Sequence, residues 1–198
     1  MRDGEEAVAA LLDVLNAHDL DYMVVGSFSS NRYGVPRATK DADFVLSIAN
    51  DERARLFSEL PPSFKIDPQV SFEMVTGTWR QIITVPEIPF TIELFELSRD
   101  EHDQARFSRR RKSTLIGKQA WIPTPEDVVI QKLRWCVGGK RSKDFEDVVA
   151  VLGVQGEGKL DWEYIRGWCE KHGTTGVSDE AVAQARVAWD AVHPSENP

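Results

Sequence analysis

The sequence predicts an α/β core followed by a helical C-terminal region. Up to residue 122, segments with apolar residues at helical spacing alternate with short apolar or alternating runs, which is the pattern of interleaved helices and strands. From Pro123 onward, only helical patterns follow, separated by glycine-rich or polar segments. We therefore expect an α/β core over residues 1–122 and a helical region over 123–198 that packs on this core, in an α+β arrangement with a mixed sheet flanked by helices.

Each element of the core follows from a local pattern. Apolar residues at helical spacing open the chain, and an apolar run before Gly26-Ser27 and another after residues 39–43 indicate strands. The expected elements are a helix over 5–18, a strand over 22–26, a short helix over 27–33, a strand over 42–48, a helix capped by Asn50 or Asp51 and ending near Leu60, a hairpin of 70–75 and 79–85 around Thr76-Gly77-Thr78, a strand over 90–97, a helix whose end spans 105–112, and one or two short strands within 113–122.

Capping residues define the helices of the C-terminal region. Thr124 suits an N-cap and Pro125 the first helical position, so a helix is expected from there to about Cys136. The Gly138-Gly139 pair should separate it from a helix over 142–152, and a loop is expected over 153–159. Asp161 and Ser178 are the expected N-caps of two further helices, which end near residues 171 and 193.

Composition limits the possible functions. The 198 residues have a net charge of −8, which argues against broad nucleic-acid affinity because such affinity depends on Lys and Arg neutralising phosphates. The exception is a local basic cluster that consists of Arg106, Arg109, Arg110, Arg111 and Lys112. This cluster is either a solvated helix end or a contact for triphosphate or RNA. No apolar run approaches the roughly 18 residues that span a bilayer. The acidic N-terminus and the two cysteines, expected to be reduced, suggest a cytoplasmic protein without membrane contact.

The segment from Tyr22 to Ile48 carries the strongest chemical signal. Asp41 and Asp43 are two residues apart at the start of a predicted strand, so their side chains should point the same way. Adjacent carboxylates repel unless a cation lies between them, and Mg²⁺ commonly binds one or two carboxylates together with substrate phosphates. Gly26-Ser27 joins a strand to a helix N-terminus, where backbone N–H groups suit phosphate. The segment therefore predicts a site for a magnesium–nucleotide complex.

These motifs resemble a known family. Gly26-Ser27 followed by Asp41-x-Asp43 resembles the signature of the polymerase-β-like nucleotidyltransferase superfamily. The run Arg37-Ala-Thr-Lys-Asp-Ala-Asp is most similar to the branch of abortive-infection toxin nucleotidyltransferases and their uncharacterised bacterial relatives. The segments that begin at Pro123 and at Lys143 resemble the helical part of the same proteins, so the likeness covers roughly residues 5–170.

The resemblance implies a third carboxylate, which binds the catalytic metal ion and accepts the proton of the attacking hydroxyl. Glu93 is the preferred residue, because it lies within a predicted apolar strand where an isolated carboxylate is costly. It occupies the place of an aspartate in similar proteins, and its longer side chain is a departure from their pattern. Asp67, next to Pro68, is expected in a turn, and Glu96 is expected on the opposite strand face.

Further site residues are expected around these carboxylates. Lys132, on an apolar helix face, either pairs with carboxylates or a phosphate oxygen, or is a surface lysine with its stem on apolar neighbours. Asp144 supports Lys132 or contributes to nucleotide binding, whereas Asp147 is expected to form structural ion pairs. Arg37 and Lys40, just before the carboxylate strand, are expected to meet the incoming phosphates.

The resulting functional hypothesis is a nucleotidyltransferase that depends on Mg²⁺ or Mn²⁺. It would move a nucleoside monophosphate from a nucleoside triphosphate such as ATP to a hydroxyl of RNA, of a protein or of a small molecule. Catalytic roles are assigned to Asp41, Asp43, Glu93 and Lys132, and nucleotide binding to Gly26, Ser27, Arg37, Lys40 and Asp144. Two alternatives stay open. One is a catalytically weak or inactive module of the same fold that binds nucleotide or a protein partner, and the other is a component of a toxin–antitoxin pair with a cognate protein partner.

Overall fold

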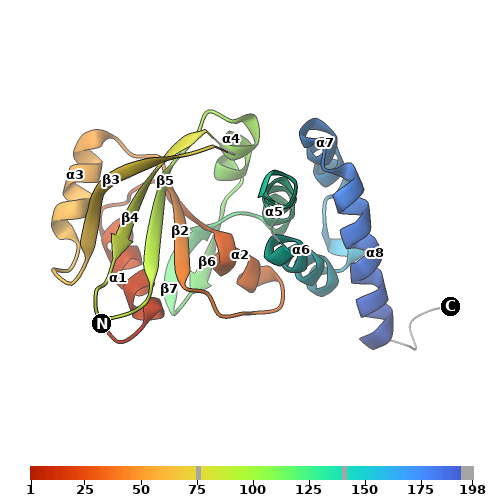
Figure 1. Ribbon diagram of the computed structural model, residues 1–198, viewed down its shortest axis with the longest axis horizontal. Coiled ribbons are helices and arrows are strands. Elements are labelled where there is room, and N and C mark those ends of the chain that lie inside the picture. The colour runs from red at the N-terminus through yellow and green to blue at the C-terminus, as the bar shows by residue number, and fades with distance from the viewer. Residues whose placement is uncertain (75–76, 140–141, 193–198) are drawn as a thin grey trace. The chain divides into compact units, whose positions relative to one another are not determined.

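The chain forms two compact units in the computed structural model, which describes residues 1–74, 77–139 and 142–192 (Figure 1). The first unit comprises Met1–Ser29 and Ala38–Pro123, and the second comprises Ser30–Arg37 together with the chain from Thr124 onward. Residues 30–37 thus group with the helices that follow residue 123, although they lie within the segment that the sequence assigns to the core.

The first unit is built around a five-stranded mixed sheet with the strand order β1-β2-β5-β4-β3. Its strands are β1 (Tyr22–Val25), β2 (Asp41–Leu46), β3 (Lys65–Glu73), β4 (Thr78–Thr84) and β5 (Thr91–Glu96), and its helices are α1 (Gly4–Ala17), the first half of α2 (Gly26–Tyr33), α3 (Asn50–Glu59) and α4 (Glu101–Ser108). A separate hairpin of β6 (Arg111–Leu115) and β7 (Lys118–Ile122) packs beside β1 and α1. Among the described strands of this sheet, β2 and β5 pair in parallel, and the other neighbours are antiparallel.

The two faces of the sheet are covered differently. On one face, Val24, Phe44 and Ile92 are buried. On the opposite face, Phe107 of α4 packs with Val45 and neighbouring apolar residues near the carboxyl ends of β2 and β5. The residues of each strand alternate between the two faces. On this second face, the first residues of β2 and β5 are polar, namely Asp41, Asp43, Thr91 and Glu93.

The second unit is helical. It contains the second half of α2, α5 (Pro125–Gly139), α6 (Ser142–Gln155), the short 3₁₀ helix η1 (Glu157–Lys159), α7 (Trp162–His172) and α8 (Thr175–Val192). Its core is an apolar cluster that includes Ile130, Leu133, Val148 and Ile165, with Tyr33 of α2 packed against it. Gly34 lies close to the backbone of Val151, which ties the segment after α2 to α6.

Most predicted elements are present with small shifts at their ends, and several predictions are wrong. The helix expected over 105–112 ends at Ser108, because Arg111 and Lys112 begin β6. Gly138 and Gly139 do not separate two helices but form the last residues of α5. Helix α6 continues to Gln155 into the expected loop. Ser178 is not an N-cap, since α8 already begins at Thr175.

Two smaller differences concern the caps and the hairpin. Ala49 is the N-cap of α3 rather than Asn50 or Asp51, and the side chain of Glu52 accepts the Ala49 backbone N–H at 2.7 Å. The predicted hairpin is present as β3 and β4, although β3 starts five residues earlier than expected and residues 75 and 76 of the expected turn lie outside the described part of the chain.

Candidate functional site

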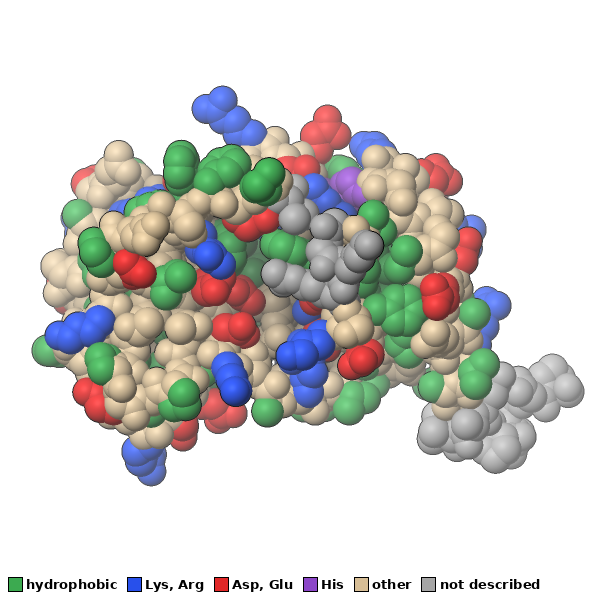
Figure 2. Space-filling view, in the orientation of Figure 1, with side chains coloured by type: hydrophobic (Ala, Val, Ile, Leu, Met, Phe, Trp, Pro, Cys, Tyr) green, Lys and Arg blue, Asp and Glu red, His purple; other side chains and the backbone are tan. Residues whose placement is uncertain are grey.

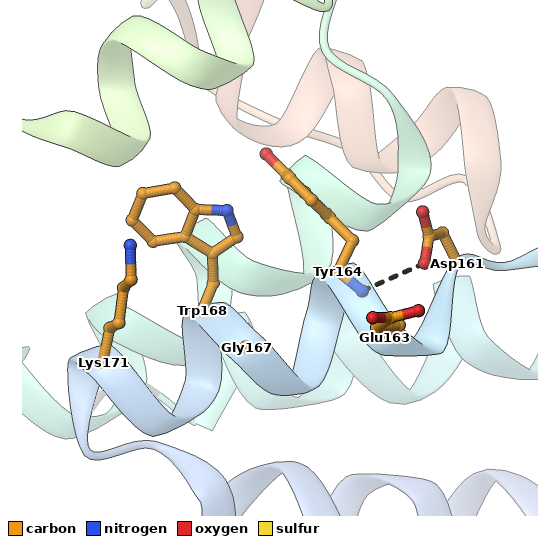
Figure 3. Close-up of a pocket in the computed structure, with 6 residues that line it drawn as sticks. All are labelled: Asp161, Glu163, Tyr164, Gly167, Trp168 and Lys171. Atoms are coloured by element: carbon orange, nitrogen blue, oxygen red, sulfur yellow. Dashed lines mark hydrogen bonds between the residues drawn. The ribbon is translucent and has the colours of Figure 1, made fainter.

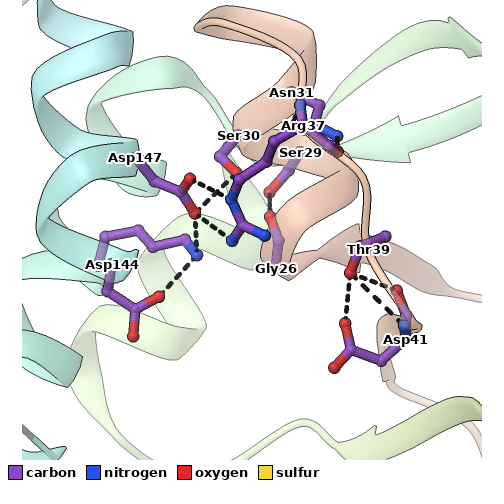
Figure 4. Close-up of polar contacts among 10 residues, drawn as sticks. Gly26, Ser29, Ser30, Asn31, Arg37, Thr39, Asp41, Asp144 and Asp147 are labelled. Carbon is purple, nitrogen blue, oxygen red and sulfur yellow. Dashed lines mark hydrogen bonds and ion pairs between the residues drawn. The ribbon is translucent and has the colours of Figure 1, made fainter. Parts of the chain in front are cut away.

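Asp41 and Asp43 begin β2 and share one face of the sheet. Both side chains are partly accessible, whereas the alternating residues Ala42 and Phe44 are buried on the other face. Thr39, just before the strand, donates a hydrogen bond from Oγ1 to Oδ1 of Asp41 at 2.6 Å (Figure 4). The Asp41 carboxylate is therefore held by its own chain at the point where the strand begins.

Asp43 lies directly against the start of α2. Its strand partner is Val25, the last residue of β1, and α2 begins at the next residue without an intervening loop. Gly26 adopts a positive φ of 61°, and a Cβ atom at this position would overlap the Asp43 carboxylate. Only glycine combines this backbone conformation with such close approach. The strand–helix junction and the carboxylate thus form one tightly built feature.

Glu93 lies beside Asp43, as the sequence predicts for a third carboxylate on this face. The parallel register of β2 and β5 pairs Asp43 with Glu93 and Asp41 with Thr91. Glu93 is also bound by a cation that the sequence interpretation missed, because Nη1 of Arg80 on β4 lies 3.1 Å from its Oε2. Alternation along β4 places Arg80 on the Glu93 face, but the pairing depends on a strand register that local patterns do not reveal.

The other acidic residues considered for this role lie elsewhere. Asp67 is located at an irregularity in the pairing of β3 with β4, where its Oδ1 accepts the backbone N–H of Gln69 at 2.9 Å. Glu96 alternates to the opposite side from Glu93 and pairs with Arg53 of α3 at 3.3 Å. The position of Glu96 agrees with the expected opposite strand face. The turn expected at Asp67 is wrong, because Asp67 lies within β3, where the irregular pairing lets its side chain bind the chain two residues on.

The three carboxylates fit a divalent cation by residue type and by backbone placement. Carboxylate oxygens are the ligands that Mg²⁺ prefers, and these three acids lie on one face of two adjacent strands, beside the close approach of Asp43 to Gly26. Within residues 1–74, 77–139 and 142–192, no three Asp, Glu, His or Cys side chains already converge as a metal-binding group. In this structure Thr39 holds Asp41 and Arg80 holds Glu93, so these contacts would have to rearrange around an ion.

A second polar cluster lies in the helical unit (Figure 4). Lys132 of α5 donates to Asp144 and Asp147 of α6, at 2.7 Å in both cases. Arg37 binds both oxygens of Asp147 through Nε at 2.8 Å and Nη2 at 2.9 Å, and Ser30 donates to Asp147 at 3.3 Å. The cluster joins three segments of this unit, as expected for a paired, hydrogen-bonded ion network.

The cluster is buried, so its pairing matters for stability. Lys132, Asp144 and Asp147 each expose less than a tenth of their surface, which excludes the surface-lysine interpretation of Lys132. Burial alone would raise the pKa of Asp147, but hydrogen bonds from Arg37 and Lys132 outweigh it and hold this pKa below its ordinary value. Burial, and next the negative charge of Asp144, raises the pKa of the Cys136 thiol to about 11.

The remaining predicted phosphate contacts have mixed positions. Arg37 is engaged by Asp147, whereas Lys40 is exposed and its carbonyl accepts the Thr91 N–H at 3.1 Å. Ser27 is buried at the start of α2. The nucleotide-binding roles of Gly26, Ser27, Arg37, Lys40 and Asp144 stay predictions.

The basic cluster at residues 106–112 is partly structural. Arg106 is buried and pairs with Asp103 at 2.8 Å. The guanidinium of Arg110 lies over the ring of Phe107 and pairs with Asp21 at 2.5 Å. These contacts favour a structural role over phosphate binding for two of its five members. On the face that Figure 2 shows, basic and acidic side chains are interspersed without a continuous basic surface.

A pocket in the helical unit was not anticipated from the sequence. It has a volume of about 400 Å³ and is lined by Asp161, Glu163, Tyr164, Gly167, Trp168 and Lys171 (Figure 3). The ammonium group of Lys171 lies 4.4 Å from the centre of the Trp168 ring, and the hydroxyl of Tyr164 donates to buried Asp127 at 2.7 Å. Trp168 also packs against the helical core, so the pocket wall is part of the packing of this unit.

None of the helices in the described ranges combines the length and the apolar character that crossing a membrane requires. Cys136 and Cys169 are free thiols, as expected from the cysteine count.

Comparison with known proteins shows similarity at the level of structure. No family model and no curated protein sequence matches the chain. A crystal structure of ANT(2")-Ia in complex with adenylyl-2"-tobramycin has a TM-score of 0.60 at 9% identity, over 86% of this chain and 97% of that one. JHP933 from Helicobacter pylori has a TM-score of 0.54 at 15% identity, over 96% and 92%. An antigenic nucleotidyltransferase-like protein from Paracoccidioides brasiliensis has a TM-score of 0.52 at 13% identity, over 91% and 92%.

Proposed function

We propose that this chain, whose fold is that of the nucleotidyltransferases, transfers a nucleoside monophosphate from a nucleoside triphosphate to a hydroxyl acceptor. The reaction takes place on the sheet face that carries Asp41, Asp43 and Glu93. The observation that carries this proposal is the contact of Asp43 with Gly26 at the start of α2, beside Glu93 on the parallel neighbouring strand. The backbone that would bind phosphate and the carboxylates that would bind the metal then lie next to each other within the first unit.

The residues of this feature have distinct roles in the proposed reaction. The N–H groups at the start of α2 have no partners within the helix and carry its positive dipole end, so Gly26 and Ser27 bind the triphosphate. Asp41, Asp43 and Glu93 would hold one or two Mg²⁺ or Mn²⁺ ions, and such ions would supply positive charge to the phosphates. Glu93 is in addition the base that accepts the proton of the acceptor hydroxyl.

The reaction balances without a further reactant. The acceptor oxygen forms a bond to the α-phosphorus while the bond between the α-phosphorus and the bridging oxygen breaks. Pyrophosphate leaves with the electron pair, and the hydroxyl proton passes to Glu93. ANT(2")-Ia with adenylyl-2"-tobramycin supports this reaction class, because that ligand is an acceptor carrying a transferred adenylyl group.

The Arg80–Glu93 pair favours a second candidate function. A Glu93 side chain that remains bound to Arg80 cannot serve fully as a metal ligand or base. A module of the same fold that binds nucleotide without transferring it would have this arrangement. A toxin–antitoxin association stays a prediction in both cases.

A transfer assay distinguishes the two functions. Each of the four α-labelled nucleoside triphosphates is incubated with the protein and with cellular RNA, protein extract or small metabolites, in Mg²⁺ or Mn²⁺. We expect labelled acceptor with the wild type and none with Asp41→Ala or Asp43→Ala, because these remove metal ligands. Glu93→Asp should retain transfer, since aspartate is the residue of similar proteins. Binding of a nucleotide without transfer to any acceptor would favour the binding module.

A further inference from the structure

Arg80 is fixed on the same sheet face as the proposed catalytic carboxylates. Its Nη1 donates to Glu93 at 3.1 Å, and its Nε donates to Oγ of Ser71, its direct partner on β3, also at 3.1 Å. Both residues hold the guanidinium in this structure, and Ser71 would still hold it if Glu93 turned towards a metal ion. About a third of the Arg80 side chain is exposed. Within the described residues, its other N–H donors have no partner. Arg80 is therefore a positioned cation with donors to spare.

The strand order defines the side of the site on which Arg80 lies. Gly26 and Ser27 follow β1, Asp41 and Asp43 are on β2, Glu93 is on β5, and Arg80 is on β4. In a phosphoryl transfer, the attacking and leaving oxygens are roughly in line across the phosphorus. If the pyrophosphate lies towards the start of α2, the acceptor must approach from the β5–β4 side. Arg80 then lies on the acceptor side.

We propose that Arg80 binds a phosphate group of the acceptor, next to the attacking hydroxyl, and thereby selects phosphate-bearing acceptors. This inference rests on the proposed function and extends it to the class of acceptor. A guanidinium presents several donors in a plane and matches phosphate oxygens in a two-pronged contact. A terminal nucleotide of RNA and a free nucleotide both place a phosphate near a hydroxyl, and they share this chemistry.

The same charge acts against other acceptors. A positively charged aminosugar would be repelled by the guanidinium, and a neutral sugar would leave its donors without a partner, so both are disfavoured. The acidic balance of the chain adds no general attraction for phosphates. Preference for a phosphate-bearing acceptor therefore has to come from individual cations such as Arg80.

Binding without nucleotide tests the contact independently of catalysis. A fluorescent eight-nucleotide RNA with a free 3′ hydroxyl is titrated with the full chain in EDTA, and its affinity is measured by anisotropy. Arg80→Gln should weaken binding about tenfold, the effect of losing one charge-assisted contact, while Arg80→Lys should recover part of it. Arg53→Gln is the matched control, because Arg53 also pairs with a glutamate, Glu96, but on the other face of the sheet. An unchanged affinity for Arg80→Gln contradicts the proposal even if the protein has no transferase activity.

Transfer kinetics test the same contact during turnover. Arg80→Gln should raise the KM for an acceptor about tenfold and leave the KM for the nucleoside triphosphate unchanged, both with the RNA and with a free nucleoside 5′-monophosphate as acceptor. An effect with the RNA alone assigns the contact to the nucleic-acid backbone, and an effect with both assigns it to the terminal nucleotide. A changed KM for the triphosphate alone, or a wild-type preference for an aminosugar or an acidic peptide, overturns the proposal. Melting curves of each variant verify that it is folded.

Discussion

Gly26 and Asp43 lie so close together that any side chain at position 26 would occupy the space of the Asp43 carboxylate. This contact joins the end of β1, the start of α2 and the carboxylate strand β2. It explains why the chain has glycine at this junction, both for its positive φ and for the space that the carboxylate needs. The integrity of the proposed nucleotide site depends on this relationship.

The first prediction concerns Gly26→Ala. The new methyl group must displace Asp43, so the stabilisation of the protein by Mg²⁺–nucleoside triphosphate should disappear, in addition to a backbone strain of about 1–2 kcal/mol. Thermal melts with and without the Mg²⁺–nucleotide complex measure both effects. Gly117→Ala is the control, because Gly117 also has a positive φ but has no atoms near its Cβ direction. It should show strain alone, and equal responses of the two variants would contradict the steric account.

The second prediction concerns Lys132. Lys132→Met leaves Asp144 and Asp147 buried with less compensation, and should lower the free energy of unfolding by about 3–5 kcal/mol. Urea unfolding followed by circular dichroism measures the loss. Lys118→Met removes an exposed pair with Asp13 and should cost at most about 1 kcal/mol. Normal stability of Lys132→Met together with lost transfer would instead assign Lys132 to the reaction.

The third prediction concerns acid stability. The folded-state pKa of Asp147 lies below its ordinary value of 3.8, so the unfolded chain binds a proton at this group more readily than the folded chain. Its contribution to stability is complete above pH 3.8 and decreases as pH falls from there through the lowered pKa. Urea unfolding between pH 3 and 7 measures this effect. The free energy of unfolding of Asp147→Asn should be lower than that of the wild type at neutral pH, and it should decrease less steeply as the pH falls. An identical decrease in the free energy of unfolding with falling pH in the wild type and in Asp147→Asn would contradict the lowered pKa of Asp147.

The fourth prediction concerns Cys136. With its pKa raised to about 11, only about one thiol in a thousand is ionised at pH 8, and the thiolate is the reactive form. Iodoacetamide should therefore modify Cys136 much more slowly in the folded protein than in the same chain unfolded in urea. Peptide mass spectrometry of quenched samples gives the rate at each cysteine. Comparable rates in both states would show that the thiol is not desolvated.

Local patterns predicted the parts of the site that lie within single elements. The apolar run before Gly26-Ser27 indicates where the first strand ends. The alternation after Asp41 indicates which acidic side chains share a face of the next strand. Each of these signals lies within one short segment. The start of α5 at Pro125 was predicted for the same reason, because capping chemistry is local. Gly138 and Gly139 misled the prediction, since glycine lowers helix propensity without preventing a helix that tertiary packing stabilises.

The long-range parts of the site required the structure. Arg80 and Glu93 meet because of the register between β4 and β5, and the sequence shows only that both lie in strands. The engagement of Arg37 by Asp147, 110 positions apart, was likewise not foreseen. A shift of one residue in the pairing of β4 with β5 would place a different side chain beside Glu93. The sequence around Arg80 alone therefore does not identify its partner.

Metal-dependent nucleotide binding at Asp43 and Glu93 tests the central claim most directly. Mn²⁺ binding is measured by the loss of the free-ion electron paramagnetic resonance signal, with each nucleoside triphosphate, for the wild type, Asp43→Asn, Glu93→Gln and the distant control Asp13→Asn. We predict tight Mn²⁺–nucleotide binding by the wild type and by Asp13→Asn, loss of binding in Asp43→Asn, and weakened binding in Glu93→Gln. The melting temperature of free Asp43→Asn should stay equal or rise slightly, since this variant removes a repelling charge. Glu93→Gln also loses the ion pair with Arg80, so its melting temperature should change little in either direction. Equal Mn²⁺ binding by the wild type and Asp43→Asn would contradict the proposed site.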